Sequence, residues 1–341
     1  MKPLIKYPGG KKKELRIISE YLPPNIHDYY EPFVGGGAVL WELALGENKY
    51  INDLSTDLTN FYQCVQRQDA EFFEELNLWN NRFYQTTAFA QEHMTTLIYA
   101  YQTRDIEALH LDELTERILL EKYQHIQRKA EKSGTVDQIE ENIIAAFRQS
   151  VYVVARDRYN RHKEYDGIRA ALYVVMRQYA FSGMFRYNSD GLFNIPYGGI
   201  PYNNKNLSER IEMMHSVETT EILGHTLIEN TDFETFLEAR HLRNDDFVFL
   251  DPPYDTTFSA YDNNEFNRRD QLRLANYLKD RCNANWMLVI KATDYIRTLY
   301  PVGSPCMDNR VIRIVEFDKR YDVCMKGRND QNCEHLLITN Y

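Results

Sequence analysis

The sequence contains no apolar run that approaches the roughly 18 residues needed to cross a membrane. Its first residues are rich in lysine and lack the apolar core of a secretory signal peptide. The five cysteines are an odd number without a Cys-x-x-Cys pair, which argues against a disulfide framework and a zinc knuckle. We therefore expect a cytoplasmic protein without a membrane partner, whose thiols are buried or incidental.

An excess of positive charge is also missing, because the formal net charge is −10. This balance argues against a protein that coats nucleic acid without regard to sequence, since such affinity grows with the number of phosphates neutralised. Basic residues nevertheless gather in two runs, at residues 2–16 and 148–169. Each run is either a local groove for an anion or a solvated face, and the second could follow phosphates.

Size and composition indicate a large folded protein. The chain has 341 residues, more than one domain usually holds, so we expect one large domain with an insertion, or two domains. Hydrophobic residues make up 43% and charged residues 26%, which are ordinary values, but 25 tyrosines are many. Tyrosine suits a wet surface that must also stack on other rings.

The first part of the chain predicts an α/β domain. Residues 29–62 have the pattern of a βαβ unit, with strands at 29–34 and 49–53, a glycine turn at 35–37 and a helix at 38–45. Strand and helix patterns return near the end of the chain. Strands are expected at residues 220–222, 226–228, 247–250, 286–291, 311–317 and 335–340, and helices at 233–239 and 268–282.

The middle of the chain differs from both ends. Residues 69–175 have helical periodicity with a break near Ser133-Gly134 and no strand signal, which predicts a helical insertion. Residues 181–204 are rich in Tyr, Asn, Gly and Pro, which is typical of an exposed hairpin or loop.

The segment Asp251-Pro252-Pro253-Tyr254 follows the apolar run at residues 247–250 directly. Two prolines end strand pairing and form a stiff corner, and open α/β sheets bind ligands at the carboxyl ends of strands. In such a corner the Asp251 carboxylate and the Pro252 carbonyl could accept from one planar amine while Tyr254 stacks on its ring. The alternative is a proline-stiffened turn with a capping aspartate.

Two glycine turns offer backbone amides to a ligand. Gly35-Gly36-Gly37 lies between a strand and a helix but lacks G-x-G-x-x-G spacing, so a methionyl carboxylate suits it as well as a pyrophosphate. Asp53, at the end of the next strand, can take ribose hydroxyls or cap the following helix. Near the N-terminus, Gly9-Gly10 and Lys11 could meet a carboxylate while Tyr7 covers a ligand ring.

Five ordered motifs together resemble the Dam-type, D12 class of DNA adenine-N6 methyltransferases. They are Lys6-Tyr-Pro-Gly-Gly-Lys11, Glu31-Pro-Phe-Val-Gly-Gly-Gly37, Asp53, Arg186-Tyr-Asn188 with Gly191-Leu-Phe-Asn-Ile-Pro196, and Asp251-Pro-Pro-Tyr254. The closing segment, residues 334–341, is similar to the last strand of that family. The resemblance spans the chain except for residues 69–170.

The resemblance implies a Rossmann-like, S-adenosylmethionine-dependent methyltransferase fold. Residues 1–61 and 216–341 would form the catalytic domain. Residues 62–215 would form an inserted, mainly helical target-recognition domain, with a DNA-reading hairpin near residues 181–204.

The resemblance also implies a site. S-adenosyl-L-methionine would be the methyl donor, with no metal, and Asp251, the Pro252 carbonyl and Tyr254 would hold the target adenine. Asp232 would bind the donor adenine, although it could equally be a helix N-cap. The other donor residues would be Tyr7, Gly9, Gly10, Lys11, Phe33, Gly35 and Asp53.

The chemistry follows from the nature of the target amine. The lone pair of adenine N6 is delocalised into the ring, so two acceptors would help by favouring a pyramidal nitrogen aligned with the methyl sulfonium. The base must also leave the duplex before N6 can be reached. Phe181 or Ser182 would, by resemblance, fill the space that it vacates.

Sequence recognition is expected from the hairpin. Arg186 can donate two hydrogen bonds to guanine, and Pro196 could meet a thymine methyl. Arg186, Asn188 and Pro196 recur in the GATC-reading members, which predicts GATC or a site containing GAT. A phosphate contact or a hairpin salt bridge is the alternative for Arg186.

The expected partners are double-stranded DNA and a cognate restriction endonuclease. One alternative is N6 methylation of adenine in RNA, or of another planar amide. Another is a non-catalytic DNA-binding partner of an endonuclease, against which the intact motifs argue. A nicotinamide dehydrogenase is disfavoured because G-x-G-x-x-G is missing.

Overall fold

The computed structural model describes residues 1–7, 10–11, 14–103, 105, 109–133, 138–254, 266–320 and 332–341. Chain contacts divide the protein into two compact units. We call Met1–Pro3, Gly9–Gln63 and Val217–Tyr341 the sheet unit, and Leu4–Pro8 with Cys64–Ser216 the helical unit. Each unit is described by itself.

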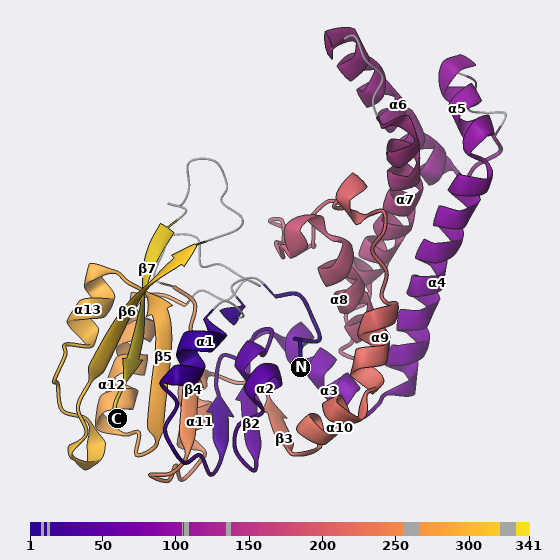
Figure 1. Cartoon of the computed structure of the whole chain (residues 1–341). Helices are drawn as coiled ribbons and strands as arrows, with labels where there is room; N and C mark the ends of the chain where they lie inside the picture. Colours follow the sequence, from indigo (N-terminus) through magenta and orange to yellow (C-terminus); the bar gives the residue numbers. More distant parts are fainter. Residues whose placement is uncertain are drawn as a thin grey trace. The chain divides into compact units, whose positions relative to one another are not determined.

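The sheet unit is built on one sheet, which has seven strands among the described residues, in the order β3-β2-β1-β4-β5-β7-β6 (Figure 1). The first five strands in this order run parallel, and β7 is antiparallel to both β5 and β6. The strands are β1 (Tyr29–Glu31), β2 (Lys49–Asn52), β3 (Thr226–Glu229), β4 (Phe247–Leu250), β5 (Asn285–Lys291), β6 (Arg313–Arg320) and β7 (Asn332–Thr339).

The strand order reverses between β1 and β4. β1 pairs with β2 on one side and with β4 on the other, although β4 comes much later in the chain. Such a switch point leaves a crevice at the carboxyl ends of the two strands, where open α/β sheets bind ligands. By this rule, a ligand site is expected among the residues that follow Glu31 and Leu250.

Short helices connect the strands of the sheet unit. All four residues of β4 are buried, and two of them, Val248 and Leu250, share a core with α12, β5 and β7. α12 begins with a capping box in which Asn267 and Asp270 satisfy each other's backbone N–H groups. The helices are α1 (Leu15–Glu20), α2 (Ala38–Leu43), α3 (Thr56–Gln66), α10 (Val217–Gly224), α11 (Phe233–Glu238), α12 (Arg268–Asp280) and α13 (Asp294–Leu299).

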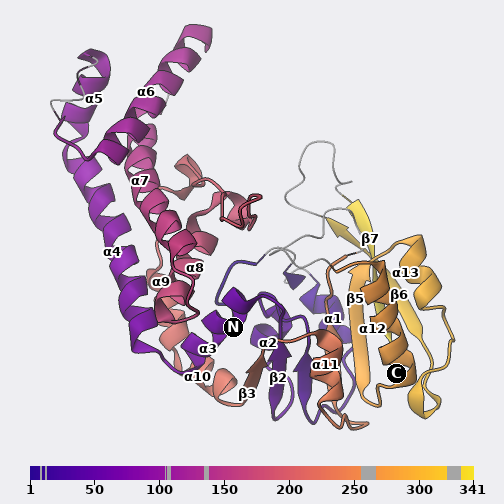
Figure 2. The same ribbon diagram turned by 180° about the vertical axis from the view of Figure 1, so that it is seen from behind.

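The helical unit packs α4, α7 and α8 against one another, and α5 and α6 extend it at one end (Figure 2). That end has its own apolar core, drawn from α5, α6 and α7. The helices are α4 (Ala70–Glu92), α5 (Met94–Thr103), α6 (Glu113–Ser133), α7 (Ile139–Arg161), α8 (Gly167–Tyr179) and α9 (Ser208–His215). The 3-10 turns η3 (Phe181–Gly183) and η4 (Ile200–Tyr202) follow α8.

Most of the predicted elements are present. The strand at residues 247–250 matches β4, and the expected hairpin after residue 181 is held by the antiparallel bridges Ala180↔Tyr197 and Tyr187↔Phe193. The strand expected at residues 220–222 is wrong, because these residues lie in α10. There Thr219, Ile222 and Leu223 are buried at helical spacing, which a short apolar run does not reveal. No helix among the described residues is long and apolar enough to span a membrane.

Candidate functional site

The corner after β4 is fixed by two neighbouring elements. Gln271 of α12, fully buried, donates from Nε2 to the Pro253 carbonyl at 2.8 Å. The Tyr254 ring meets the ring of His335 in β7 edge to face, with 5.5 Å between centroids. The corner at residues 251–254 is therefore a rigid feature of the core, and Gln271 is a contributor that the sequence did not reveal.

Lys11 brings the N-terminal segment to this corner. Its Nζ forms an ion pair with the Asp251 carboxylate and donates to the Tyr254 hydroxyl at 3.1 Å. The Lys11 side chain is only 2% exposed, while that of Asp251 is 22% exposed. The partial exposure of Asp251 leaves its carboxylate within reach of a ligand. The sequence had suggested Lys11 only for donor binding.

The glycine turn after β1 is held by Asp53. Its carboxylate accepts from Gly35 N at 3.0 Å and from Ser55 N at 2.9 Å, and Tyr62 OH donates to the Gly35 carbonyl at 2.9 Å. Gly35 and Gly37 have φ values of 48° and 65°, where side chains are strained. The structure therefore brings Gly35 and Asp53 together, as the βαβ pattern predicted, and gives Asp53 a role in shaping the turn.

Glu31 connects these two corners electrostatically. It ends β1 and is 2% exposed. Burial raises the pKa of Glu31 well above its usual range, and the charges of Asp251 and Asp53 act in the same direction. Three carboxyl groups thus influence one another at the carboxyl edge of the sheet. The sequence had given Glu31 a place in a motif but no role of its own.

Asp232 and Phe33 lie in the same unit but in different surroundings. Asp232 is the N-cap of α11, accepting from Glu234 N at 3.0 Å, and it forms an ion pair with Arg273 at 2.7 Å. The helix-cap alternative is therefore correct, and a role in donor binding stays a prediction. Phe33 packs with Phe233 and Phe266, each with 5.5 Å between ring centroids.

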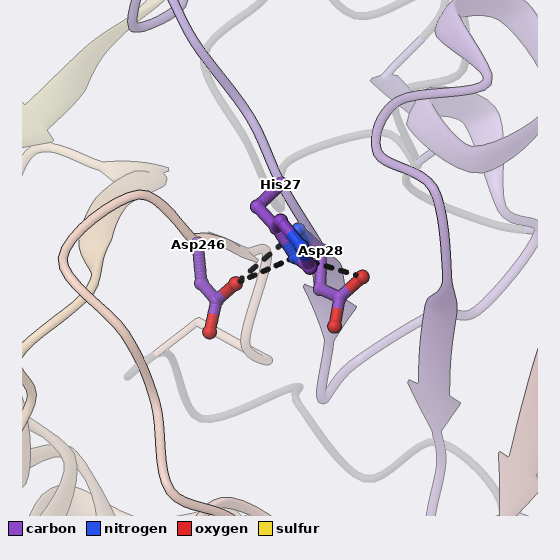
Figure 3. Close-up of side chains that lie close together, drawn as sticks. All are labelled: His27, Asp28 and Asp246. Carbon is purple, nitrogen blue, oxygen red and sulfur yellow. Dashed lines mark hydrogen bonds and ion pairs between the residues drawn. The ribbon is translucent and has the colours of Figure 1, made fainter.

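The amino edge of the sheet carries a second group of ionisable residues (Figure 3). His27 Nδ1 lies 3.3 Å from Asp28 and 3.8 Å from Asp246, and its Nε2 lies 3.1 Å from Arg243 Nη1. Since a guanidinium only donates, Nε2 accepts and Nδ1 carries the hydrogen that faces the carboxylates. The group therefore ties the starts of β1 and β4 together.

Tyr7 belongs to the helical unit, where it covers Arg177. Arg177 is 2% exposed, and its guanidinium carbon lies 4.7 Å from the Tyr7 ring centroid and 3.8 Å from that of Phe185. It also donates to the Gly183 carbonyl at 3.5 Å. Arg177 thus joins the N-terminal segment to η3, a contact that sequence reasoning missed. Gly10 is exposed, and Gly9 lies outside the described residues.

The hairpin after α8 displays all five predicted DNA-binding residues. Phe181 is 48% exposed, and Ser182 has a φ of 55°, a strained value for a serine. The Pro196 carbonyl accepts from Phe181 N at 2.9 Å, which closes the base of the hairpin.

The tip of the same hairpin presents Arg186 and Asn188, both exposed. Arg186 Nε donates to Asn194 at 3.2 Å. Arg186 forms no ion pair within the described part of the chain, so the alternative of a salt bridge within the hairpin is not met there. Asn188 Oδ1 accepts from the backbone N–H groups of Asp190 and Leu192 and shapes the turn.

The basic run at residues 148–169 is not one continuous charged face. Arg148 is 3% exposed and donates to Tyr197 OH, Thr87 Oγ1 and the Lys205 carbonyl. Arg169 is also buried and donates to the His162 carbonyl. The suggestion that the run follows phosphates is therefore wrong for these two arginines, because their guanidinium groups are buried and donate hydrogen bonds inside the protein.

Comparison with known proteins identifies a family. The family model of D12 class N6 adenine-specific DNA methyltransferase matches residues 7–302. The type II methyltransferase M.CviBI of Paramecium bursaria Chlorella virus NC1A is 26% identical over 100% of both chains. M.MjaIII of Methanocaldococcus jannaschii is 28% identical over 100% of this chain and 99% of its own. A DNA adenine methylase of Vibrio cholerae is 24% identical over 87% of this chain and 83% of its own.

Proposed function

Because the chain belongs to the D12 class of N6 adenine-specific DNA methyltransferases, we propose that it transfers a methyl group from S-adenosyl-L-methionine to N6 of an adenine rotated out of duplex DNA. The observation that carries this proposal is the corner at the carboxyl end of β4. There a partly exposed Asp251 is paired with a buried Lys11, beside Tyr254.

Asp251 and the Pro252 carbonyl would position the amine. Two acceptors directed at the N6 hydrogens favour a pyramidal nitrogen whose lone pair faces the methyl carbon. N6 would then bond to that carbon as the sulfur–carbon bond breaks and S-adenosyl-L-homocysteine leaves, and N6 would pass one proton to the Asp251 carboxylate or to water. The Lys11 ammonium, which is paired with the Asp251 carboxylate, would hold that side chain in place. Tyr254, held by His335, would stack on the flipped ring.

The glycine turn after β1 would receive the methyl donor. A Cβ on Gly37 would lie 2.9 Å from Trp41 Nε1, so the packing of the protein itself requires glycine at this position of the turn. Asp53 would bind the ribose, Gly9, Gly10 and Lys11 would meet the carboxylate, and Phe33 would lie in the same donor pocket. Tyr7 and Asp232 complete the proposed donor residues. Asp232 would have to share its carboxylate between the ligand and Arg273.

The hairpin of the helical unit would read the DNA. Phe181 is large, apolar and exposed next to the strained Ser182, as a wedge between bases requires. Arg186 would donate to guanine, while Asn188 and Pro196 complete the recognition surface for GATC or a site containing GAT. Replacing Arg186 by alanine should cost about 1–3 kcal/mol of discrimination at one base pair. Equal rates on all single-base variants of the site would remove Arg186 from recognition.

A tritiated-donor assay tests the proposal directly. The wild-type protein should transfer label to duplex DNA and not to RNA of the same sequence, whereas Asp251→Ala should transfer none and still bind the donor. Label transfer by Asp251→Ala would refute the role of the corner. Preference for RNA would favour the RNA alternative, and no transfer to either acceptor would favour a non-catalytic partner of an endonuclease. The names of type II relatives make an endonuclease partner worth seeking in neighbouring genes.

A further inference from the structure

A pair of lysines in the helical unit shares one aromatic ring. The Nζ atoms of Lys6 and Lys205 lie 5.9 Å and 3.1 Å from the centroid of the Tyr202 ring. Neither lysine forms an ion pair with a carboxylate among the residues that the structure describes. Two ammonium groups gathered on one ring without an acid form an unbalanced cationic cluster, which an anion would stabilise.

The backbone beneath both lysines is fixed. Lys6 follows the buried Leu4 and Ile5, and the Leu4 carbonyl accepts from Arg210 Nη1 at 2.6 Å. Lys205 N donates to the Tyr202 carbonyl at 3.1 Å, and the Lys205 carbonyl accepts from the buried Arg148. The backbone that carries the two lysines is therefore ordered before any ligand arrives, which lowers the entropic cost of binding.

The Tyr202 ring is also fixed in position by close packing against the chain. A Cβ on Gly198 would lie 2.3 Å from the Tyr202 ring, so only glycine lets the ring pack against the chain at this point. The electrostatics agree with the geometry. Burial, followed by the charges of Lys205 and Arg210, lowers the pKa of Lys6 to about 8, and burial likewise lowers the pKa of Lys205. The protein keeps like charges together at a cost, as ligand sites often do.

The position of the cluster suggests its ligand. A Cβ on Gly183, the last residue of η3, would lie 4.0 Å from the Lys6 Cβ, so Lys6 adjoins the turn that carries Phe181 and Ser182. We propose that Lys6 and Lys205 bind a backbone phosphodiester of DNA next to the flipped nucleotide. This inference rests on the proposed function for the identity of the ligand, but the anion site itself does not require methyl transfer.

Salt dependence of DNA binding measures the phosphate contact. Anisotropy of a labelled duplex should show that Lys205→Ala and Lys6→Ala each make the slope of log affinity against log salt less steep, and that the double variant reduces its magnitude by about 0.9, the value for one phosphate. The loss should be equal on target and non-target duplexes, and Lys205→Arg should restore the slope. Lys279→Ala, which removes a lysine from α12 of the sheet unit, is the matched control and should leave the slope unchanged. Unchanged slopes in both test variants would overturn the proposal.

Three further measurements distinguish failure of this inference from failure of the proposed function. Thermal melting should show Lys205→Ala folded and at least as stable as wild type, because a like-charge repulsion is removed. Stabilisation of the wild type by inorganic phosphate without any change in DNA slope would assign the site to free phosphate and contradict the proposal. A reduced slope in a protein that methylates no DNA would sink the proposed function alone, whereas methylation with unchanged slopes would sink this inference alone.

Discussion

The two edges of the sheet place similar carboxylates in different surroundings. Asp246 and Asp251 stand at opposite ends of β4, separated only by Phe247–Leu250. Asp246 is 1% exposed and accepts from the backbone N–H groups of Asp28 and Arg243 at 3.2 and 2.8 Å. Asp251 is 22% exposed and is paired with the side chain of Lys11. Asp246, with its backbone partners, is a structural residue that connects two segments of the chain. Asp251 has a side-chain partner and is partly exposed, so it can meet a ligand.

The largest effect is expected from Asp251→Asn. An amide keeps the shape of the corner but supplies a weaker acceptor, so the rate of methyl transfer should fall roughly 10²–10³-fold, as it does when an enzyme loses a key electrostatic contact. Single-turnover kinetics would measure the rate, and equilibrium dialysis should show unchanged donor affinity. A rate within tenfold of wild type would mean that the two edges do not differ as described.

Lys11→Met should reduce the rate less, by about 10–100-fold, because it removes a charge-assisted partner of Asp251 while the carboxylate remains. Lys11→Arg retains the charge and should recover part of the rate. If methionine and arginine lower the rate equally, Lys11 acts through its shape, and the contrast between backbone and side-chain partners would lose its basis.

Asp246→Asn should lower the stability of the protein and leave the rate of methyl transfer unchanged, the reverse of what is expected for Asp251→Asn. Loss of one charged acceptor leaves a buried N–H group poorly satisfied, so the free energy of unfolding should fall by about 1–3 kcal/mol. The rate per folded molecule should stay near that of wild type, since Asp246 lies at the edge away from the corner. Urea titration, with activity normalised to the folded fraction, separates the two quantities. If Asp246→Asn were stable but inactive, Asp246 would have a functional role and not a structural one, which would contradict the roles given to the two edges.

The smallest change in the rate of methyl transfer is expected from Glu31→Gln, whose effect lies in the pH dependence of stability. The folded-state pKa of Glu31 is raised by burial, so the folded protein binds more protons than the unfolded chain once pH exceeds the usual carboxyl range. Stability from this group is complete below that range and is lost as pH rises through the folded pKa. Glutamine cannot ionise, so the variant should lose less stability than wild type on going to alkaline pH. Parallel stability curves for the two proteins would contradict this account.

The sequence predicted those parts of the site that lie within one segment. The run at residues 247–250 and the two prolines after it specify both β4 and the corner, because burial, chain stiffness and position all follow locally. The pair Lys11–Asp251 joins residues 240 positions apart, and no local pattern reveals such a contact.

The sequence also did not reveal which arginines are buried. Arg148, Arg169 and Arg177 read as solvated or basic residues in a linear sequence, yet each lies inside the helical unit among tyrosine and phenylalanine rings. Whether an arginine is exposed depends on which helix faces meet, and this is decided only when α4, α7 and α8 pack. The many tyrosines predicted a surface for stacking, and several of them serve instead as partners for these buried guanidinium groups.

The most direct measurement is identification of the methylated nucleoside. Duplex DNA containing GATC and control sites is incubated with S-adenosyl-L-methionine and each protein, digested, and analysed by mass spectrometry. Wild type, and Asp246→Asn once corrected for its folded fraction, should produce N6-methyldeoxyadenosine, and Asp251→Asn should produce almost none. Absence of this nucleoside with wild type, or equal amounts with Asp251→Asn, would contradict the assignment of methyl transfer to the carboxyl end of β4.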